Sequence, residues 1–311
     1  MMRPITLAIH GGAGTLLKGN MTSEKEKVYK DALASALEQG YAILDANGTA
    51  VEAVEVAVKA LEDSPLFNAG KGSVFTAEGT HEMDAAIMDG NTLNAGAVSL
   101  ITGIKNPVSL AREVMEKSEH VFLAGEGAMQ FAEDHGFALE DAAYFHDELR
   151  HKQWLAIRGS DSFQLDHSDK KDSKFGTVGA VALDAHGDIA AATSTGGMTN
   201  KKWGRVGDSP MIGAGNYANN ATCAVSCTGS GEFFIRGVVA YDVSCLMEYK
   251  GMTLQEAADE VIQKRIVAIG GDGGLIAVDV HGNSTMSFNT EGMYRAKKDS
   301  FGTHEISIYK E

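Results

Sequence analysis

The chain has 311 residues, of which 44% are hydrophobic and 22% are charged, with 36 glycines but only 4 prolines. This composition is typical of a globular protein and excludes a disordered, collagenous or fibrous chain. The 27 Lys and Arg against 42 Asp and Glu give a formal net charge of −15, which argues against nucleic-acid binding through bulk electrostatics.

The cysteine count and the N-terminal sequence bear on the compartment. The 3 cysteines, Cys223, Cys227 and Cys245, form no CxxC pair, so we expect core residues rather than a disulfide framework or a zinc site. The sequence before the first glycines has no long apolar run, and no apolar stretch approaches the roughly 20 residues that cross a bilayer. We therefore expect a reduced, cytoplasmic protein with no membrane partner.

The first half of the chain mixes strand and helix signals. Alternation at Ile5–His10 predicts a strand that leads into the glycines of HGGAG at 10–14. Apolar residues at three- and four-residue steps predict a helix at 23–46, and Thr49 with Glu52 forms the capping box of a second helix, which Pro65 ends. After a glycine-bearing loop at 66–72, we expect strands around 82–89 and 95–101 and helices at 107–117 and 126–135.

A polar segment divides the two halves of the chain. The stretch at 151–157 is helical or irregular, and the charged residues that follow include almost no apolar side chain. Such a segment buries too little surface to order itself, so we expect a mobile linker at 158–175.

The second half repeats a turn. Residues 178–195 are expected to form two strands joined by a turn at 186–188, and the D-x-H-G-[DN] pattern that starts at Asp184 recurs at Asp279. The pair indicates strands of two stacked sheets or of one extended sheet, although such turns are also common in unrelated hairpins. Between them we expect a helix at 231–249 and another capped by Thr253 and Glu256. Because strands and helices come in separate runs, an α+β fold with antiparallel sheets is favoured over a doubly wound sheet.

The junction between the linker and the following strand contains the clearest candidate for a catalytic residue. If the Gly176–Thr177 bond were cleaved, Thr177 would carry a nucleophilic hydroxyl and a free α-amine on one residue. That amine, with a pKa of about 7.7–8.0, is able to accept the hydroxyl proton as the hydroxyl attacks a carbonyl. The ordinary alternative is that Gly-Thr simply begins a strand.

Three other polar segments contain residues that could orient Thr177, bind a substrate or stabilise an oxyanion. The hydroxyls of 193–195 are expected near Thr177 if the hairpin folds back, although Thr and Ser are also common in strands. Arg205 and Asp208 are able to hold the carboxylate and ammonium of an amino acid, or they pair with each other. The glycines of CTGSGE at 227–232 suit an oxyanion hole or a nucleotide phosphate equally well.

Three further features receive no catalytic role from the sequence. HGGAG matches neither a dinucleotide fingerprint nor a P-loop, and His10 is interpreted as a structural histidine. Glu82 and Asp84 resemble an acid pair, but strand alternation alone places both on one face.

Taken together, seven motifs resemble plant-type L-asparaginase, or isoaspartyl peptidase, a family of N-terminal nucleophile hydrolases. The motifs cover nearly the whole chain in order: HGGAG at 10–14, FNAGKG at 67–72, GTVGAVALD at 176–184, ATSTGG at 192–197, GRVGDSP at 204–210, GAGNYA at 213–218 and CTGSGE at 227–232. The resemblance implies an α+β fold of four layers, an αββα sandwich, formed as a single domain over 1–311. It also implies autocleavage between Gly176 and Thr177 into an α chain of 1–176 and a β chain of 177–311, with two αβ units forming a dimer that is a heterotetramer of chains.

The resemblance also implies roles for individual residues. Thr177 would be the nucleophile, with Thr195 contacting its hydroxyl and Asn68 lying nearby. Arg205 would bind the substrate α-carboxylate, Asp208 the α-ammonium, and the carbonyl of Gly231 would lie near that ammonium. Two pairs of residues complete the set: Thr228 and Gly229 would form the oxyanion hole, and Gly11 and Gly12 would lie beside the scissile bond.

The same resemblance implies a structural sodium ion held by backbone carbonyls of the loop that spans 61–71. The expected ligands are the carbonyl groups of Leu61, Glu62, Ser64, Phe67, Ala69 and Lys71. Ser64 and Lys71 differ from the usual family residues, a change that backbone ligation tolerates.

The implied reaction is hydrolysis of a β-linked aspartyl amide without a catalytic cofactor. Thr177 would attack the side-chain carbonyl of L-asparagine or of a β-aspartyl dipeptide, and water would release L-aspartate from the resulting ester. The rivals are a glycosylasparaginase, a taspase-like endopeptidase, an unprocessed amino-acid-binding scaffold and a nucleotide-binding protein that uses HGGAG.

Overall fold

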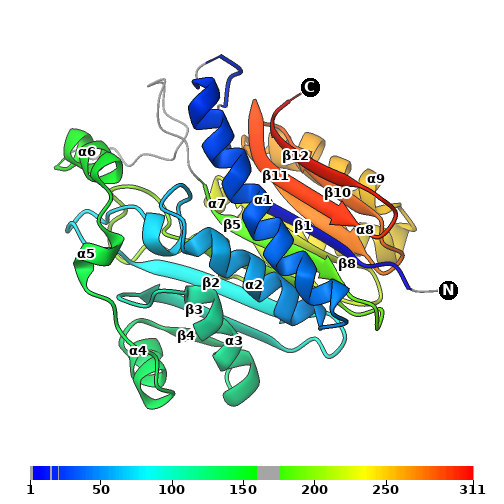
Figure 1. Ribbon diagram of the computed structural model, residues 1–311, viewed down its shortest axis with the longest axis horizontal. Helices are drawn as coiled ribbons and strands as arrows, with labels where there is room; N and C mark the ends of the chain where they lie inside the picture. Colours follow the sequence, from blue (N-terminus) through cyan, green and yellow to red (C-terminus); the bar gives the residue numbers. More distant parts are fainter. Residues whose placement is uncertain (1–2, 15, 20, 160–175, 311) are drawn as a thin grey trace.

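The computed structural model describes residues 3–14, 16–19, 21–159 and 176–310. Of the linker expected at 158–175, only Arg158 and Gly159 fall within the described residues. The fold is mixed α/β and contains two β-sheets, with strands and helices arranged as Figure 1 shows.

The larger sheet has eight strands in the order β12-β11-β1-β5-β6-β2-β3-β4. Neighbouring strands are antiparallel except for β3 and β4, which are parallel. The bounds are β1 Thr6–Gly14, β2 Met83–Asp89, β3 Ala95–Ile101, β4 Phe122–Ala124, β5 Val178–Leu183, β6 Ile189–Thr195, β11 Gly292–Asp299 and β12 His304–Tyr309.

The smaller sheet has four antiparallel strands in the order β10-β9-β8-β7. Its strands are β7 Asn216–Ala218, β8 Cys223–Gly229, β9 Gly273–Asp279 and β10 Ser284–Phe288. The two hairpins expected from the repeated turn therefore belong to different sheets, β5–β6 to the larger and β9–β10 to the smaller.

The helices fall into two groups along the chain. The first group is α1 Ser23–Asp45, α2 Ala50–Glu62, α3 Pro107–Lys117, α4 Gly125–Asp134, α5 Ala142–Phe145 and α6 Glu148–Ile157, with a 3-10 turn at Gly70–Gly72. The second group is α7 Gly231–Gly237, α8 Val239–Lys250, α9 Leu254–Asp259 and α10 Ile266–Ala268, with a π-helical turn at Glu260–Arg265. In Figure 1, α1 and α2 lie in front of the larger sheet.

Three clusters of buried apolar side chains hold these elements together. One joins α1, α2 and α3 to the larger sheet, with Leu33 and Val58 fully buried in it. A second lies between the sheets and includes Val181 of β5 and Ile276 of β9. The third joins the smaller sheet to the second group of helices, for example through Val243 of α8. Both sheets are therefore covered by apolar contacts on two faces, which accounts for the continuous burial of β1 and β5.

Several elements confirm the sequence predictions. The strand at 95–101, the helix at 107–117 and the hairpin at 178–195 appear as expected. The capping box is also present, because the Thr49 hydroxyl accepts from the Glu52 backbone N–H while the Glu52 carboxylate accepts from that of Thr49.

Other predicted elements were wrong in extent. The helix expected at 231–249 is broken at Val238, whose φ of 47° is left-handed and ends α7 before α8 begins. Strand β1 continues through the glycines to Gly14, with an irregularity in its pairing to β11 between His10 and Ala13. Helix α2 stops at Glu62, three residues before Pro65. The sequence analysis did not predict β4, β7, β8, β11 or β12.

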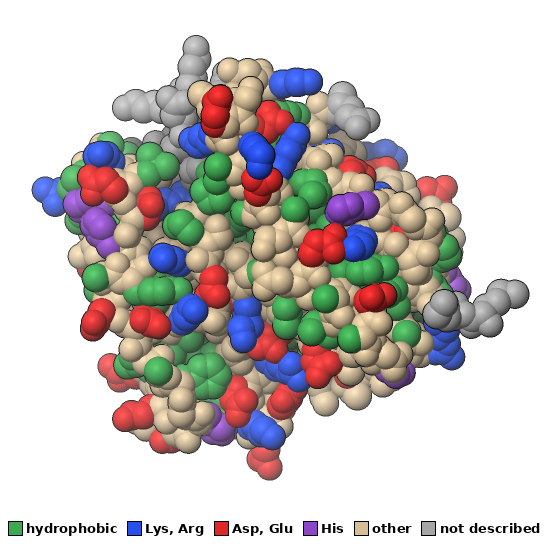
Figure 2. Space-filling view, viewed as in Figure 1, with side chains coloured by type: hydrophobic (Ala, Val, Ile, Leu, Met, Phe, Trp, Pro, Cys, Tyr) green, Lys and Arg blue, Asp and Glu red, His purple; other side chains and the backbone are tan. Residues whose placement is uncertain are grey.

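Acidic and basic side chains are both present on the face of the molecule that Figure 2 draws. Figure 2 shows acidic and basic side chains interspersed over the described residues of the face in view, with no continuous basic area there. None of the described helices combines the length and the apolar character that crossing a bilayer requires.

Candidate active site

Thr177 lies at the N-terminal end of β5, next to the end of β6. The β5–β6 register pairs Val178 with Ser194, which places Thr177 beside Thr195. The Thr177 hydroxyl donates to the Thr195 hydroxyl oxygen at 3.1 Å, and that oxygen also accepts from the Gly197 backbone N–H at 3.0 Å. Thr195 thus fixes the orientation of the Thr177 hydroxyl and is itself fixed by the turn that follows β6.

Ser209 is a further neighbour that the sequence analysis missed. Its hydroxyl lies 3.4 Å from the Thr177 hydroxyl, and either oxygen is able to donate. The residue belongs to GRVGDSP, the motif that supplied Arg205 and Asp208. A small hydroxyl residue next to Asp208 was the only available signal.

The backbone around the Gly176–Thr177 bond is tightly packed against the end of β1. Gly12 has a φ of 109°, and a Cβ placed on it would lie 2.5 Å from the Gly176 nitrogen and 2.6 Å from its Cα. A Cβ on Gly11 would collide with the ring of Phe67. Glycine at 12 is therefore required both by its conformation and by the close approach of Gly176.

Asn68 connects three parts of the site. Its side-chain N–H donates to the Gly197 carbonyl at 2.7 Å, and its side-chain oxygen accepts from the Val74 N–H at 3.1 Å. Its own carbonyl accepts from the Gly196 N–H at 3.0 Å. Asn68 thus holds the turn after β6 in place, and its side chain also lines the pocket at Thr177.

Thr228 and Gly229 lie at the end of β8 and line the pocket. The Thr228 hydroxyl is buried, and within the described part of the chain it has no hydrogen-bond partner. A Cβ on Gly176 would lie 3.1 Å from that hydroxyl oxygen. A buried hydroxyl that lies beside Gly176 and has no partner among the described residues suits the stabilisation of negative charge that develops on a carbonyl oxygen.

Arg205 and Asp208 both line the pocket, but they do not form the ion pair that was the ordinary alternative. Arg205 pairs with Glu232, not with Asp208: its Nε and Nη2 donate to the two Glu232 carboxylate oxygens at 2.8 and 2.9 Å. A Cβ on Gly231 would lie 2.9 Å from both Arg205 Nη2 and Asp208 Oδ1, so these groups surround Gly231. The sequence analysis included Glu232 in CTGSGE but gave it no role and did not predict this pairing.

The Asp208 side chain is buried, and its burial changes the pKa of its carboxyl group. Burial raises the pKa of its carboxyl to about 7, and the nearby Arg205 guanidinium opposes the shift. Its Oδ2 has no hydrogen-bond partner among the described residues. A bound ammonium group would donate to this oxygen and add a positive charge beside the buried carboxylate.

His10 occupies the structural position that we expected. It is fully buried, its Nε2 lies 2.9 Å from the Ser226 hydroxyl, and Ser226 lies 2.7 Å from the Thr193 hydroxyl. Burial lowers the pKa of His10 to about 3, although the nearby Thr177 backbone favours the protonated form. A neutral His10 therefore links β1 to β8 and β6.

Cys223 and Cys227 are buried in the core, and all three cysteines are free. Glu82 precedes β2, where its carbonyl accepts from the Lys201 ammonium at 2.6 Å. Asp84 is buried and accepts from the Leu100 N–H. Neither Glu82 nor Asp84 lines the pocket at Thr177.

The loop of the expected sodium ion folds closely on itself. A Cβ on Gly70, whose φ is 52°, would lie 2.5 Å from the Glu62 carbonyl oxygen, so the two ends of the loop meet there. The carbonyls of Leu61, Phe67 and Ala69 already accept backbone N–H groups within the loop. Because carbonyl oxygen has a second lone pair and suits hard cations, the loop remains chemically suited to an alkali ion.

One pocket thus collects most of the residues expected from the sequence. It is lined by Ala13, Asn68, Gly176, Thr177, Thr195, Gly197, Met198, Arg205, Gly207, Asp208, Ser209, Thr228 and Gly229. Gly11, Gly12 and Gly231, which were also expected at the site, are not among the residues that line this pocket.

Comparison with known proteins agrees with this arrangement. A family model described as asparaginase matches residues 2–308. The chain belongs to the asparaginase family. The match includes every residue of the pocket, so the site and the family assignment rest on the same part of the chain.

Asparaginase-family relatives match over nearly their whole length. An isoaspartyl peptidase of Escherichia coli K12 is 52% identical over 314 residues, covering 100% of this chain and 98% of the relative. A human isoaspartyl peptidase/L-asparaginase is 44% identical, covering 96% and 94%. A plant-type L-asparaginase of Pyrococcus furiosus is also 44% identical, covering 98% and 100%.

Proposed function

We propose that this chain hydrolyses β-aspartyl amide bonds, in β-aspartyl dipeptides and in L-asparagine, and releases L-aspartate. The observation that carries the proposal is the hydrogen bond between the Thr177 and Thr195 hydroxyls at the head of β5, directly after Gly176. Membership of the asparaginase family and the activities in the names of the E. coli, human and Pyrococcus relatives support it.

Activation requires cleavage between Gly176 and Thr177. The Thr177 hydroxyl attacks the Gly176 carbonyl carbon, and the C–N bond breaks as the nitrogen takes up a proton, which leaves an ester. Water hydrolyses that ester, so that Gly176 gains a carboxylate and Thr177 a free amine and hydroxyl. The products are an α chain of 1–176 and a β chain of 177–311. The close approach of Gly12 to Gly176 supports this step, since it holds the scissile segment against β1.

The substrate is recognised through its aspartyl half. Asp208 binds the α-ammonium together with the Gly231 carbonyl, and Arg205 binds the α-carboxylate. Two guanidinium nitrogens of Arg205 already face Glu232, which leaves Nη1 outside that bidentate pair. Glu232 therefore holds the guanidinium in position, and Arg205 itself lines the pocket at Thr177.

Hydrolysis then follows in two stages. The Thr177 amine takes the hydroxyl proton as the oxygen attacks the β-carbonyl carbon, and the oxyanion forms against Thr228 and Gly229. The C–N bond breaks as the amine returns the proton to the leaving ammonia or amino acid. Water then attacks the β-aspartyl ester, which frees L-aspartate and restores the Thr177 hydroxyl. No step uses a cofactor.

The architecture we propose is the four-layer αββα sandwich of N-terminal nucleophile hydrolases, formed as a single domain. The three apolar clusters, helices to sheet, sheet to sheet and sheet to helices, support it. We further propose a dimer of αβ units, a heterotetramer of chains, in the cytoplasm.

We also propose that the loop at 61–71 holds a structural sodium ion through the carbonyls of Leu61, Glu62, Ser64, Phe67, Ala69 and Lys71. The close contact between Gly70 and the Glu62 carbonyl supports a carbonyl-lined site. When bound, the ion would supply only a positive charge that orders the loop, whose residue Asn68 lines the pocket.

Product release from two substrates tests the proposed reaction. Purified protein is incubated separately with L-asparagine, with β-Asp-Leu and with a glycosylated asparagine, and the release of ammonia and aspartate and the binding of aspartate are measured. The Thr177→Ala variant serves as the control. We expect both products from the natural chain and neither from the variant. Release only from a glycosylated asparagine would favour a glycosylasparaginase, and binding of aspartate without any release would favour a scaffold.

A further inference from the structure

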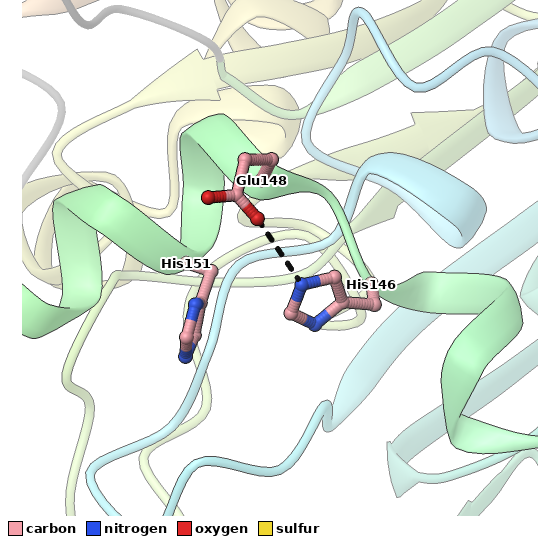
Figure 3. Close-up of side chains that lie close together, drawn as sticks. All are labelled: His146, Glu148 and His151. Carbon is pink, nitrogen blue, oxygen red and sulfur yellow. Dashed lines mark ion pairs between the residues drawn. The ribbon is translucent and has the colours of Figure 1, made fainter.

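Three side chains of types that bind metals lie at the junction of α5 and α6. His146 follows the last residue of α5, Glu148 begins α6, and His151 lies one turn further along that helix. Figure 3 shows the three side chains gathered at this junction, with His146 and Glu148 directed toward each other. None of the three lines the pocket that contains Thr177.

The geometry brings one ligand atom from each residue close together. These atoms all lie within 4.8 Å of one another, and His146 Nε2 is 3.8 Å from Glu148 Oε2. The two imidazole rings have their centroids 4.9 Å apart. In the described part of the chain, no other group of three His, Cys, Asp or Glu residues comes this close.

Aromatic contacts hold the two imidazoles in place. The Phe75 ring lies 5.8 Å from His146 and 5.5 Å from His151, centroid to centroid. His151 is also stacked on Trp154 at 5.7 Å. Ligands whose rings already pack against neighbours lose less conformational freedom when they bind a metal, so the arrangement is partly preorganised.

We propose that His146, Glu148 and His151 bind one divalent transition-metal ion, with Zn²⁺ as the best match. Two imidazole nitrogens and one carboxylate oxygen are the ligand types that Zn²⁺ takes at three positions, with water at the fourth. Metal–ligand bonds of about 2.0–2.1 Å require ligand atoms about 3.4 Å apart. Side-chain rotations are able to shorten the present separations, which are at most 4.8 Å, to that distance. The residues are exposed or half-buried, so the ion reaches them directly from solvent.

The ion would stabilise the fold locally and take no part in hydrolysis. It fastens the end of α5 to α6 and anchors both against Phe75. The Phe75 carbonyl accepts from the Asn200 N–H at 2.9 Å, and the neighbouring Ala77 N–H donates to the Lys201 carbonyl at 2.9 Å. The segment held in this way continues from Met198, which lines the pocket at Thr177.

Lys152 competes for the same carboxylate. Its ammonium lies 3.3 Å from Glu148 Oε1, and both side chains are mostly exposed. Such a surface ion pair is weak, so a divalent ion displaces it. A Lys152→Gln variant removes the competitor and is expected to bind Zn²⁺ at least as tightly as the natural chain.

Metal binding is measured on full-length, tag-free protein by calorimetry with Zn²⁺ and by the visible absorption of bound Co²⁺. The variants are His146→Ala, His151→Ala and Glu148→Gln, and the matched control is His135→Ala, an exposed histidine at the end of α4. We expect one ion per chain of 311 residues, and at least about a tenfold loss of affinity in each of the three variants but not in the control. The Thr177→Ala chain should bind equally well, so this test is independent of the proposed reaction.

Clear outcomes would overturn the proposal. They are no saturable binding by the natural chain, an unchanged affinity in His151→Ala or Glu148→Gln, or an equal loss in His135→Ala. Glu148→Gln keeps the interpretation clean because this exposed side chain is not part of the core, so the variant is expected to fold. Zn²⁺ should also raise the Tm of the natural chain but not that of Glu148→Gln.

Discussion

The two hairpins β5–β6 and β9–β10 share a turn but differ in chemistry. In the first, Asp184 Oδ1 accepts from the backbone N–H groups of His186 and Asp188; in the second, Asp279 Oδ1 accepts from those of His281 and Asn283. The hydrogen bonds measure 2.9 and 3.0 Å in both turns. The same turn therefore closes both hairpins, and in the first the Asp184 Oδ2 also accepts from the Ala50 N–H at the start of α2.

The difference lies at the open ends of the hairpins. The first ends in Thr177 and Thr195, whose hydroxyls are joined by a hydrogen bond. At the matching positions the second has Asp272, which accepts from the Ser230 hydroxyl, and Thr290, which donates to the Gly292 carbonyl at 2.9 Å. The turn alone therefore does not make a hydroxyl reactive. The side chains at the open end of the hairpin and the residues that precede its first strand decide it.

We expect the largest effect when equivalent substitutions in the two hairpins are compared. Thr177→Ala removes the attacking oxygen, so we expect no cleavage and a fall in kcat of about 10⁴-fold or more. Thr290→Ala changes the equivalent place in the second hairpin and is expected to cleave and turn over normally. Gel electrophoresis and aspartate release measure both variants, and comparable losses in the two would contradict the comparison.

Thr195→Ala sharpens the contrast at the partner hydroxyl. The variant keeps the nucleophile but removes the oxygen that orients it, so we expect kcat to fall by about 10²–10³-fold. Thr195→Ser retains that oxygen and should recover most of the activity. A serine variant as poor as the alanine variant would mean that the methyl group, and not the hydroxyl, matters.

Substitution of the charged residues should affect substrate recognition more than cleavage. Arg205→Lys loses the planar fork, and the loss of a charged hydrogen bond of about 1.5–3 kcal/mol corresponds to about a 10- to 150-fold fall in kcat/KM. Cleavage at Gly176 should continue, since the scissile bond needs no bound amino acid. An Arg205→Lys chain that stays whole would contradict the assignment of this residue to the substrate.

The smallest effect concerns stability and pH. Burial raises the pKa of Asp208 to about 7 from 3.8, so its ionised form is less stable in the fold than in the unfolded chain. The resulting loss of stability begins as pH rises above the unfolded pKa and is complete above about 7. Asp208→Asn should therefore raise the Tm at pH 8 but hardly at pH 4, as calorimetry would show. An equal gain at both pH values would contradict a buried, ionised Asp208.

The sequence predicted local features well where the signal is local. The capping box at Thr49 and the helix at 107–117 follow from neighbouring residues alone, as does the hairpin at 178–195. The seven motifs also named most of the pocket, because the residues of the pocket lie within or next to short, ordered segments of sequence.

Features that depend on distant contacts were not predictable in this way. The pairing of Arg205 with Glu232 joins residues 27 apart and depends on the placement of α7 beside the loop before β7. The break at Val238 depends on a left-handed backbone that valine does not favour, so no sequence signal marks it. Strand β11 carries a charge on half of its residues, and it is ordered by pairing with β1 on one side and with the edge strand β12 on the other.

The liberated amine of Thr177 is the central element of the account, and a cleavage time course tests it most directly. Freshly purified chain is incubated at neutral pH, and the cleaved fraction and the aspartate release rate are measured on the same samples by mass spectrometry and by assay. We predict fragments of residues 1–176 and 177–311, with activity that rises in proportion to cleavage. Full activity from the intact chain, or unchanged activity after the new amine is chemically blocked, would contradict the account.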